Sequence, residues 1–387
     1  MNAKPKIIVF GIAFWYPLAG VTYQFLHYLL GLRRLGYDPY YIEDSGRWVL
    51  KTDMSDLTPD ADPNIKAIAP VLEAYGFKDR WAFRGQYEGG KNYGIDSHKV
   101  DQLFGEAVAF LNVTGSQELR DEHMACPCKI YVETDPVASQ ILVSQNEPGT
   151  IAALDAHDIL FTFGENLGAP DCGVPVERYE WHPTRQPVLV DLWSDREMAP
   201  KNGFTTIGTW KNKGKEISLN GETYYWSKDR EFEKFFDLPT RTDASMELAC
   251  SVNEETLQRL HANRWKQVSS VEVSRNVDTY RQYIQQSRGE FTVAKDQNIR
   301  LRSGWFSDRS ACYLAAGRPV INQDTGFGNI LPTGKGLFDF QTMEDALSAI
   351  DTIEADYAGN CDAALQIAND YFAAEKVLGD LMSKSGF

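Results

Sequence analysis

The N-terminal part of the chain carries a hydrophobic pattern that predicts a strand, a helix and a second strand. Lys6 to Ala13 is an almost continuous apolar run, which is typical of a parallel strand covered on both faces. Residues 21–37, VTYQFLHYLLGLRRLGY, have an amphipathic pattern that predicts a helix ending near Gly36. The next run, DPYYIEDS at 38–45, predicts the second strand. Together these elements form the strand–helix–strand unit from which parallel sheets are built.

Beyond this unit the pattern weakens and then returns. Residues 50–95 contain many Asp, Pro and Gly residues and are expected to be irregular, and a helix is predicted over 97–111. Two further apolar runs, CKIYVETDP at 128–136 and DILFTFGEN at 158–166, predict buried strands that end in polar residues. Ligands gather outside the carboxyl ends of strands in open α/β sheets, so both strand ends are candidate site positions.

The second half of the chain starts a new series of strands and helices. Since a domain averages roughly 150 residues, a chain of 387 residues is expected to form two domains. The polar, proline-rich run at 182–203 is interpreted as the passage between them. We therefore predict a first domain at 1–198, a second at 199–368, and a terminal helix at 369–387 that packs back on the first. Strands or turns are predicted at 204–214, 246–252, 271–275, 289–295 and 318–324, and helices at 278–287, 308–317, 342–357 and 360–382.

Residues 313–329, YLAAGRPVINQDTGFGN, have a pattern that indicates a ligand-binding strand end. Gly317 is expected to end a helix whose N-cap is Ser307, because glycine is common just past a helix end. A short strand then leads into the polar, glycine-rich run from Asp324 to Gly328. Glycine lets the backbone approach a ligand closely, so this loop is predicted to form one wall of a binding site.

The segment DRSACYLAAGRPVINQDTGFGNILPTGKGLFDF, residues 308–340, resembles the donor-binding domain of glycosyltransferases with the GT-B fold. The resemblance covers residues 204–387 well and 1–200 loosely. It implies two Rossmann-like α/β domains facing a cleft. It also implies transfer of a sugar from a nucleotide-diphosphate sugar on the second domain to a hydroxyl-type acceptor on the first. One feature departs from the family pattern, because many members carry Glu-x7-Glu where this chain has Gly304 and Cys312.

Such a transfer requires positive charge near the leaving diphosphate. The unpaired N–H groups of a helix N-terminus suit this role, and we predict two such places, the helix start at 307–310 and the one that follows the loop at 325–328. Lys295 and Arg309 add fixed positive charge, with Arg302 as a third candidate. Each assignment has a structural alternative: a solvated lysine at a strand end for Lys295, an ion pair for Arg309 and a tight turn for the loop.

Further residues are predicted to contact the donor or to face the cleft. Trp305 is either a stacking platform for the nucleobase or a core residue, and Glu290 either bonds donor hydroxyls or is a surface carboxylate. The loop after the first strand is expected to let Gly20 open the first helix toward the ligand. The predicted donor-binding residues are Gly20, Trp210, Glu290, Lys295, Trp305, Ser307, Asp308, Arg309, Asp324, Thr325, Gly326 and Phe327.

Catalysis by an inverting route would require a base that takes the proton of the acceptor hydroxyl. Asp135 and Glu165 lie at predicted strand ends, where such a base belongs, and capping of the next helix is the alternative for each. His27 and His157 lie in apolar surroundings and are interpreted as core histidines.

The charge and composition narrow the choice of partners. A net charge of −15 argues against long-range attraction to nucleic acid or to an anionic membrane. A small molecule is therefore the favoured acceptor, with a modified nucleic-acid base or a lipid left open. No apolar run reaches the roughly 20 residues that span a bilayer, so stable membrane insertion is not expected. Six cysteines without a framework spacing indicate a reduced, cytoplasmic setting.

Neither a metal nor a cofactor is expected, since the nucleotide sugar is a co-substrate and the cations above suit its diphosphate. An Asp-x-Asp metal motif is not expected in the sequence. The run HMACPC at 123–128 offers one histidine and two cysteines as metal ligands. No second Cys/His pair follows at the spacing of a zinc finger.

Two other functions remain open at the level of sequence. A nucleotide-sugar epimerase shares the fold, and fold does not fix function. A nucleotide-sugar-binding protein without catalysis is the other alternative, because the Glu-x7-Glu pattern is missing.

Overall fold

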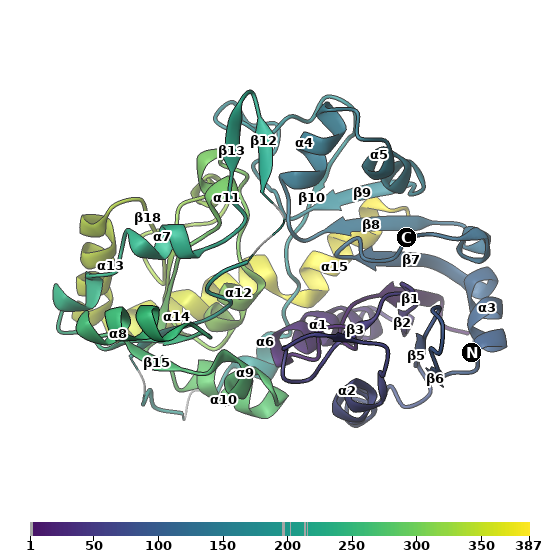
Figure 1. Ribbon diagram of the computed structural model, residues 1–387, viewed down its shortest axis with the longest axis horizontal. Coiled ribbons are helices and arrows are strands. Elements are labelled where there is room, and N and C mark those ends of the chain that lie inside the picture. The colour runs from purple at the N-terminus through teal and green to yellow at the C-terminus, as the bar shows by residue number, and fades with distance from the viewer. Residues whose placement is uncertain (1–2, 196–197, 202, 213, 215) are drawn as a thin grey trace.

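The computed structural model describes residues 3–195, 198–201, 203–212, 214 and 216–387. Two large sheets, each covered by helices, form the two halves of the molecule, with the first half purple to blue and the second mainly green (Figure 1). Positions 196, 197 and 202 of the predicted passage between domains lie outside the described residues. No helix in the described ranges is long and apolar enough to cross a membrane.

The first sheet has eight strands in the order β10-β9-β8-β7-β1-β2-β5-β6. All pairs are parallel except the last, between β5 and β6. Its strands are β1 (Lys6–Phe10), β2 (Asp38–Glu43), β5 (Trp81–Arg84), β6 (Asn92–Gly94), β7 (Ala107–Val113), β8 (Lys129–Glu133), β9 (Ile159–Thr162) and β10 (His182–Pro183).

The second sheet has six parallel strands in the order β15-β14-β11-β16-β17-β18. Counted along the chain, this is the 3-2-1-4-5-6 order of the Rossmann fold, with its switch point between β11 and β16. The first sheet also has a switch point, which lies between β1 and β7. The strands are β11 (Phe204–Ile207), β14 (Met246–Ala249), β15 (Lys266–Val268), β16 (Gly289–Thr292), β17 (Val320–Gln323) and β18 (Leu337–Phe340).

Continuous apolar runs form the central strands because both faces of each sheet are covered. In β1, Ile7 and Val9 join the apolar cluster that includes helix α1, while Ile8 and Phe10 join the one that includes α3. The helices are α1 (Ala19–Arg34), α2 (Asp62–Ala74), α3 (Ser97–Glu106), α4 (Ala138–Ser144), α5 (Pro148–Asp155), α6 (Val190–Trp193), α7 (Asp229–Glu233), α8 (Glu254–Ala262), α9 (Ser270–Ser274), α10 (Val277–Gln285), α11 (Asp296–Arg300), α12 (Asp308–Ala315), α13 (Met343–Ala355), α14 (Tyr357–Ile367) and α15 (Ala374–Lys384).

Three predictions of local structure were wrong. The range 50–95 is not irregular, since it contains helix α2 and strand β5. The helix predicted over 97–111 ends at Glu106, and the chain continues as β7, whose burial on both faces at the centre of the sheet outweighs the helix propensity of its Ala and Leu residues. The range 271–275 lies mostly in helix α9, which Ser269 caps by accepting from the N–H of Glu272.

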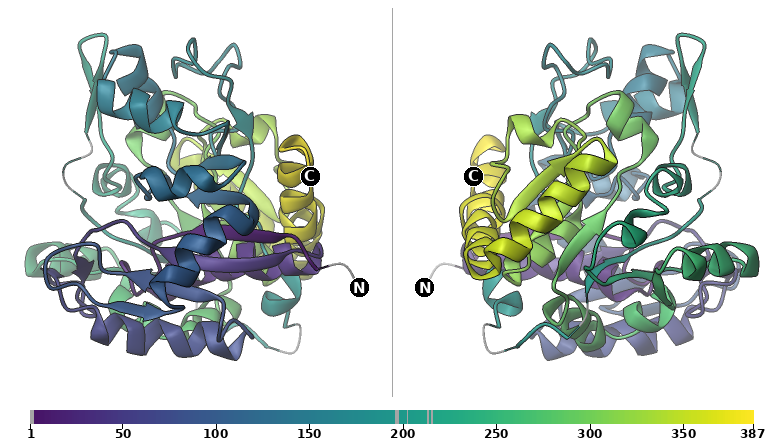
Figure 2. Two further views of the ribbon diagram at one scale, coloured as in Figure 1. Left: turned by 90° about the vertical axis from the view of Figure 1, so that its right-hand side faces the viewer. Right: turned by 90° about the vertical axis from the view of Figure 1, so that its left-hand side faces the viewer.

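The C-terminal helix α15 returns from the second half to pack against α1 in the first (Figure 2). The contact is close, because a Cβ atom at Gly31 of α1 would lie 2.6 Å from Cδ1 of Leu378. Arg34 of α1 also pairs with Glu375 at 2.9 Å. Just before α15, the N–H of Val188 donates to the carbonyl of Phe372 at 2.7 Å, so both segments that cross between the halves are hydrogen-bonded to each other.

A hairpin of the second half reaches the first half at another point. Strands β12 (Ile217–Leu219) and β13 (Glu222–Tyr224) pair antiparallel and lie beside α4 at the top of Figure 1. Ile217 and Tyr224 join an apolar cluster with Ile141 of α4. The two halves are therefore joined by apolar contacts as well as by the chain crossings.

Candidate active site

A pocket lies at the carboxyl ends of β11, β14 and β16, beside the switch point of the second sheet. This is where open α/β sheets bind their ligands. The residues that line it are Thr206, Ile207, Gly208, Thr209, Trp210, Lys228, Phe232, Leu248, Ala249, Cys250, Thr292 and Arg309. Two of the predicted donor residues, Trp210 and Arg309, are therefore in this pocket.

Arg309 is held in the wall of this pocket by three hydrogen bonds. Its Nε donates to Glu290 Oε1 at 2.6 Å, its Nη2 donates to Thr292 Oγ1 at 2.9 Å, and its Nη1 donates to the carbonyl of Ile207. Burial opposes the charge, but attraction by Glu290 outweighs it, and the pKa of Arg309 is raised. Glu290 is fully buried, and its Oε2 accepts no hydrogen bond from the described residues. The structure thus shows the buried ion pair that was the alternative for Arg309.

Lys228, which the sequence analysis missed, supplies the other basic side chain of the pocket. It immediately precedes α7, and its Nζ lies 5.6 Å from the centre of the Trp305 ring. Within the part of the chain that the structure describes, its ammonium group forms no ion pair. Burial lowers the pKa of Lys228 well below its ordinary value, and repulsion by Arg309 and Lys295 adds to the effect. No sequence motif distinguishes this lysine, because its place depends on the hairpin that precedes it.

Next to the pocket, Lys295 and Asp135 join the two halves of the molecule. Asp135 follows β8 of the first sheet, and Lys295 precedes α11 of the second half. The Lys295 Nζ lies 2.7 Å from both carboxylate oxygens of Asp135, and the indole N–H of Trp226 also donates to Asp135. The Lys295 ammonium lies 4.2 Å from the Trp226 ring centre. The predicted base and one predicted donor cation are therefore direct neighbours.

Glu165, the second predicted base, lies apart from this group. It accepts from Arg185 Nη2 at 2.5 Å, and burial raises the pKa of its carboxyl. Arg185 in turn lies 5.6 Å from the ring centres of Tyr371 and Phe372, which precede α15. Glu165 is thus part of a contact with the C-terminal segment rather than of the pocket.

The loop at 324–327 is buried under a segment of the first half. Gly326 has φ +90°, and its N–H donates to Asp324 Oδ1 at 2.7 Å, while the Thr325 hydroxyl donates to the carbonyl of Trp305 at 2.7 Å. Phe327 packs edge-on against Phe306 with ring centroids 5.3 Å apart. The tight turn named as an alternative is therefore present.

Asn166 and Asp171 cover this loop from the first half. The Asn166 amide donates to the carbonyl of Arg302 at 2.9 Å, and Arg302 bridges Asp171 and Asp324 at 2.8 and 2.7 Å. Asn329 donates to the side chains of both Asn166 and Asp171. Arg302, the third candidate cation, therefore has two carboxylate partners in this structure.

The remaining predicted residues lie at the junction of the two halves or beside the pocket. Gly20 faces Tyr280 of α10, whose hydroxyl would lie 3.1 Å from a Cβ atom at that position. Trp210 stacks on Phe232 with ring centroids 5.5 Å apart, and the Trp305 indole N–H donates to the carbonyl of Thr134 at 3.0 Å. Ser307 precedes α12 without a side-chain cap bond, and Asp308 is the first residue of that helix.

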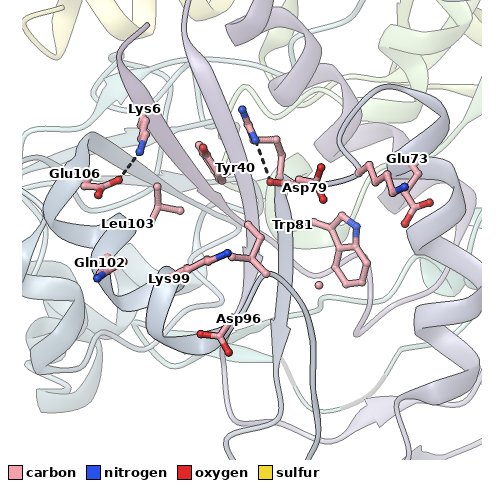
Figure 3. A pocket seen from close by; sticks show the side chains of 14 residues that line it. Lys6, Tyr40, Glu73, Asp79, Trp81, Asp96, Lys99, Gln102, Leu103 and Glu106 are labelled. Carbon is pink, nitrogen blue, oxygen red and sulfur yellow. Dashed lines mark hydrogen bonds and ion pairs between the residues drawn. The ribbon is translucent and has the colours of Figure 1, made fainter. Parts of the chain in front are cut away.

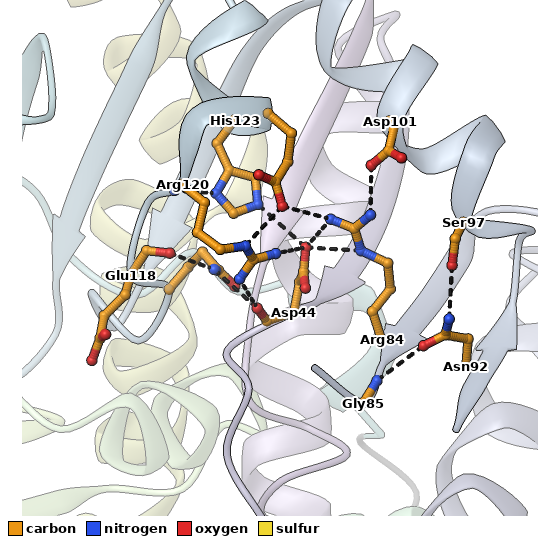
Figure 4. Close-up of polar contacts among 11 residues, drawn as sticks. Asp44, Arg84, Gly85, Asn92, Ser97, Asp101, Glu118, Arg120 and His123 are labelled. Atoms are coloured by element: carbon orange, nitrogen blue, oxygen red, sulfur yellow. Dashed lines mark hydrogen bonds and ion pairs between the residues drawn. The ribbon is translucent and has the colours of Figure 1, made fainter. Parts of the chain in front are cut away.

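One group in the described ranges brings three metal-ligating side chains together, Asp44, Glu122 and His123. Figure 4 shows Arg84 and Arg120 directed at Asp44. Arg84 is nearly buried, and Asp44 is fully buried. The carboxylate therefore already has two guanidinium partners, and this group is best described as an ion-pair network.

An Asp-x-Asp sequence does occur in the first half, at Asp60 and Asp62. It lies at the start of α2, where Asp60 Oδ1 accepts from the N–H of Asp62 at 3.1 Å. Asp62 also accepts from the hydroxyl of Tyr93. These contacts fasten the helix start, so the pair has a structural explanation.

A wider groove lies elsewhere, around the amino ends of β1 and β5 (Figure 3). Its charges are mixed and partly paired, with Lys6 bonded to Glu106 and Arg80 Nε 2.9 Å from Asp38 Oδ1. Amino ends of parallel strands are not where this fold binds ligands, so the pocket at β11, β14 and β16 is the better candidate.

Glu133, two residues before Asp135, makes the stability of this region depend on pH. Its Oε2 accepts from Thr162 and Gln140 at 2.7 and 2.6 Å, and burial raises the pKa of its carboxyl to about 7. The folded chain then keeps a proton that the unfolded chain releases, so stability falls as pH rises from the ordinary glutamate pKa through about 7. Glu133→Gln should therefore gain about 2–3 kcal/mol relative to wild type between roughly pH 5 and pH 9.

Urea denaturation of both proteins across that pH range measures this difference. Two stability curves that stay parallel would show that Glu133 does not retain its proton on folding.

No protein-family model matches the sequence, and no curated protein matches it. Solved structures do match over the whole length. An α-glucosyltransferase solved with UDP and a 13-mer DNA has a TM-score of 0.59 at 9% identity, covering 99% of this chain and 100% of that one. Anabaena HepE, solved with UDP and glucose, has a TM-score of 0.56 at 12% identity over 98% and 99%. Sucrose-phosphate synthase from Thermosynechococcus elongatus has a TM-score of 0.56 at 9% identity over 98% and 99%. With its two Rossmann-like domains, the chain has the GT-B fold that these glycosyltransferases share.

Proposed function

We propose that this protein is a glycosyltransferase that moves a sugar from a nucleoside-diphosphate donor to an acceptor hydroxyl. The observation that carries the proposal is the pocket at the switch point of the second sheet, with Lys228 in its wall as a basic side chain without a carboxylate partner among the described residues. UDP is the first nucleotide to test, because it is bound in several of the similar structures.

The cations around this pocket support a binding site for the donor diphosphate. Lys228 and Lys295 lie 5.6 and 5.8 Å from the same ring, that of Trp305, so their ammonium groups converge on one region. Arg309 also lines the pocket but is already bonded to Glu290. Lys228 is therefore the proposed primary contact of the diphosphate, with Lys295 as the second. Two ammonium groups supply charge of the kind that a leaving diphosphate requires, in keeping with a metal-independent reaction.

Asp135 is the proposed base. In the transfer, the acceptor oxygen forms a bond to the anomeric carbon while the bond from that carbon to the diphosphate oxygen breaks. The bonding electrons leave with the diphosphate, and the proton of the acceptor hydroxyl passes to a carboxylate. Asp135 lies at the end of a first-sheet strand and contacts both Lys295 and Trp226, so a movement of Lys295 toward the diphosphate would remove the ammonium partner of this carboxylate.

We further propose that residues 1–198 hold the acceptor and residues 199–368 the donor. A small, uncharged acceptor fits the net charge of −15 better than a nucleic acid does. All six cysteines are free thiols, which supports a reducing compartment such as the cytoplasm.

The test is a thermal-shift screen with UDP, GDP, TDP, ADP and CMP, with inorganic phosphate as the control. A ligand at about 100 times its dissociation constant should add about 2.7 kcal/mol of stability. Lys228→Met should weaken binding of the active nucleotide by roughly 10- to 100-fold, since a hydrogen bond to a charged group contributes about 1.5–3 kcal/mol.

Lys266→Met is the matched control, because Lys266 is exposed at the start of β15, away from the carboxyl ends of the strands. If none of the nucleotides stabilises the wild-type protein, the proposed function is wrong. Equal losses of nucleotide affinity in the two variants would show that Lys228 does not contact the nucleotide.

A further inference from the structure

The charges around Lys228 are unevenly paired. The titratable and charged groups that act on it are Arg309 and Asp308 of α12, Glu290 of β16, and Lys295 at the start of α11. Glu290 is already bonded to Arg309, and Lys295 is already bonded to Asp135. A protonated Lys228 would therefore be a third cation beside Arg309 and Lys295, and the buried carboxylate of Glu290 is already paired with Arg309.

Apolar rings also replace part of the water around the partly exposed Lys228. Trp305 and Phe232 are both less than one-tenth exposed, and Phe232 and Lys228 line the same pocket. Such an environment favours a neutral amine, as the lowered pKa of Lys228 also indicates.

We propose that Lys228 is neutral in the empty pocket and takes up a proton when a nucleoside diphosphate binds. This inference rests on the proposed function, since it requires the diphosphate to bind beside Lys228. A phosphate group brings negative charge next to the amine, and an opposite charge at close range favours the protonated form. The ligand thereby supplies the partner that the protein does not, and binding is coupled to the uptake of about one proton.

The coupling gives donor binding a defined pH dependence. Between the pKa of Lys228 in the empty pocket and its pKa in the complex, each rise of one pH unit should weaken binding about tenfold. Below the first pKa, Lys228 is already charged, and the dependence should disappear. A site that held a permanently charged cation would show no such slope.

Isothermal titration calorimetry with UDP at about pH 8 tests the inference, because a phosphate group with a pKa near 6 is then fully ionised. Titrations in HEPES, Tricine and Tris, whose ionisation enthalpies differ, give the number of protons bound per UDP from the slope of the observed enthalpy. We expect an uptake approaching one proton for the wild-type protein.

Lys228→Arg is the decisive variant, because a guanidinium stays charged at this pH and cannot take up a proton. It should bind UDP with no proton uptake, whereas Lys266→Arg should keep the wild-type uptake. UDP binding by the wild-type protein without proton uptake would overturn the inference and leave the proposed function intact. Uptake that persists in Lys228→Arg would assign the proton to another group.

A second measurement covers the case in which Lys228→Arg does not fold. The dissociation constant of the wild-type protein for UDP, followed from about pH 7 to pH 9.5, should rise by up to tenfold per pH unit. A flat profile would overturn the inference. If UDP and the other nucleoside diphosphates all fail to bind, the proposed function fails, and the inference fails with it.

Discussion

Arg309→Ala is expected to lower the free energy of unfolding by about 3–5 kcal/mol. Arg309 is the hydrogen-bonding partner of the fully buried Glu290, and its other N–H groups donate to Thr292 and to the carbonyl of Ile207. Removing the guanidinium leaves a buried carboxylate with no compensating charge, which is far more costly than the loss of a surface pair. Urea denaturation of the wild-type and variant proteins measures the effect.

Arg241→Ala is the matched control, because Arg241 pairs with Asp237 at 2.7 Å where both side chains are over two-fifths exposed. That change should cost less than about 1 kcal/mol. The double variant Arg309→Met with Glu290→Gln should be more stable than Arg309→Ala, since it removes both charges. A similar cost for Arg309→Ala and Arg241→Ala would show that the Glu290 pair contributes little.

This prediction changes how a loss of activity in Arg309→Ala should be interpreted. Arg309 lines the pocket, but its guanidinium also fastens α12 to β11 and β16. A variant that loses transfer activity through instability would say nothing about contact with a diphosphate. Lys228, which has no such structural duty among the described residues, is the better probe of the site.

Gly304→Ala is expected to cost about 2–5 kcal/mol, the sum of two effects. Gly304 has φ +79°, in the left-handed region that a residue with a Cβ atom avoids. In addition, a Cβ atom there would lie 2.4 Å from the backbone nitrogen of Asn166 and 2.7 Å from its Cβ. Because Asn166 belongs to the first half of the molecule, the clash would push the two halves apart at this contact.

Gly89→Ala separates the two effects. Gly89 has φ +75°, and nothing lies within 4 Å of a Cβ atom at that position. Its substitution should carry only the conformational cost of about 1–2 kcal/mol. Denaturation of both variants gives the comparison, and equal costs would show that the close approach to Asn166 is absent in solution.

Gly304 also explains why the chain departs from the Glu-x7-Glu pattern. A glutamate at 304 would carry its side chain into Asn166, and Cys312, the second position, is buried in the apolar core with α12. A carboxylate at 304 would require a different junction between the two halves, and one at 312 would be buried in the core. The departure therefore follows from packing at the junction.

The fold could be predicted largely from hydrophobic patterning. The strands at 38–45, 128–136 and 318–324 were recognised because each has neighbouring β-branched or aromatic residues followed by polar ones. Strand β7 was missed because its sequence, AVAFLNV, follows a helix without a turn signal and contains good helix formers. Only its position at the centre of the sheet, between β8 and β1, makes it a strand.

The site was harder to predict, because it depends on which groups are already bonded to one another. The sequence predicted Arg309 and Lys295 as contacts of the diphosphate but could not show that they form ion pairs with Glu290 and Asp135. For the same reason the sequence did not point to Lys228, which stands out because it has no such partner within the described residues. Pairing is a property of the assembled fold, whereas residue type is a property of the sequence.

The return of α15 to α1 has a consequence for synthesis of the chain. Val188 and Gly31 receive their neighbours Phe372 and Leu378 only after the whole second sheet has been translated. The first half therefore cannot complete its packing as it emerges from the ribosome, although its eight strands are already available. The face of α1 that packs against α15 therefore stays uncovered until α15 itself has been translated.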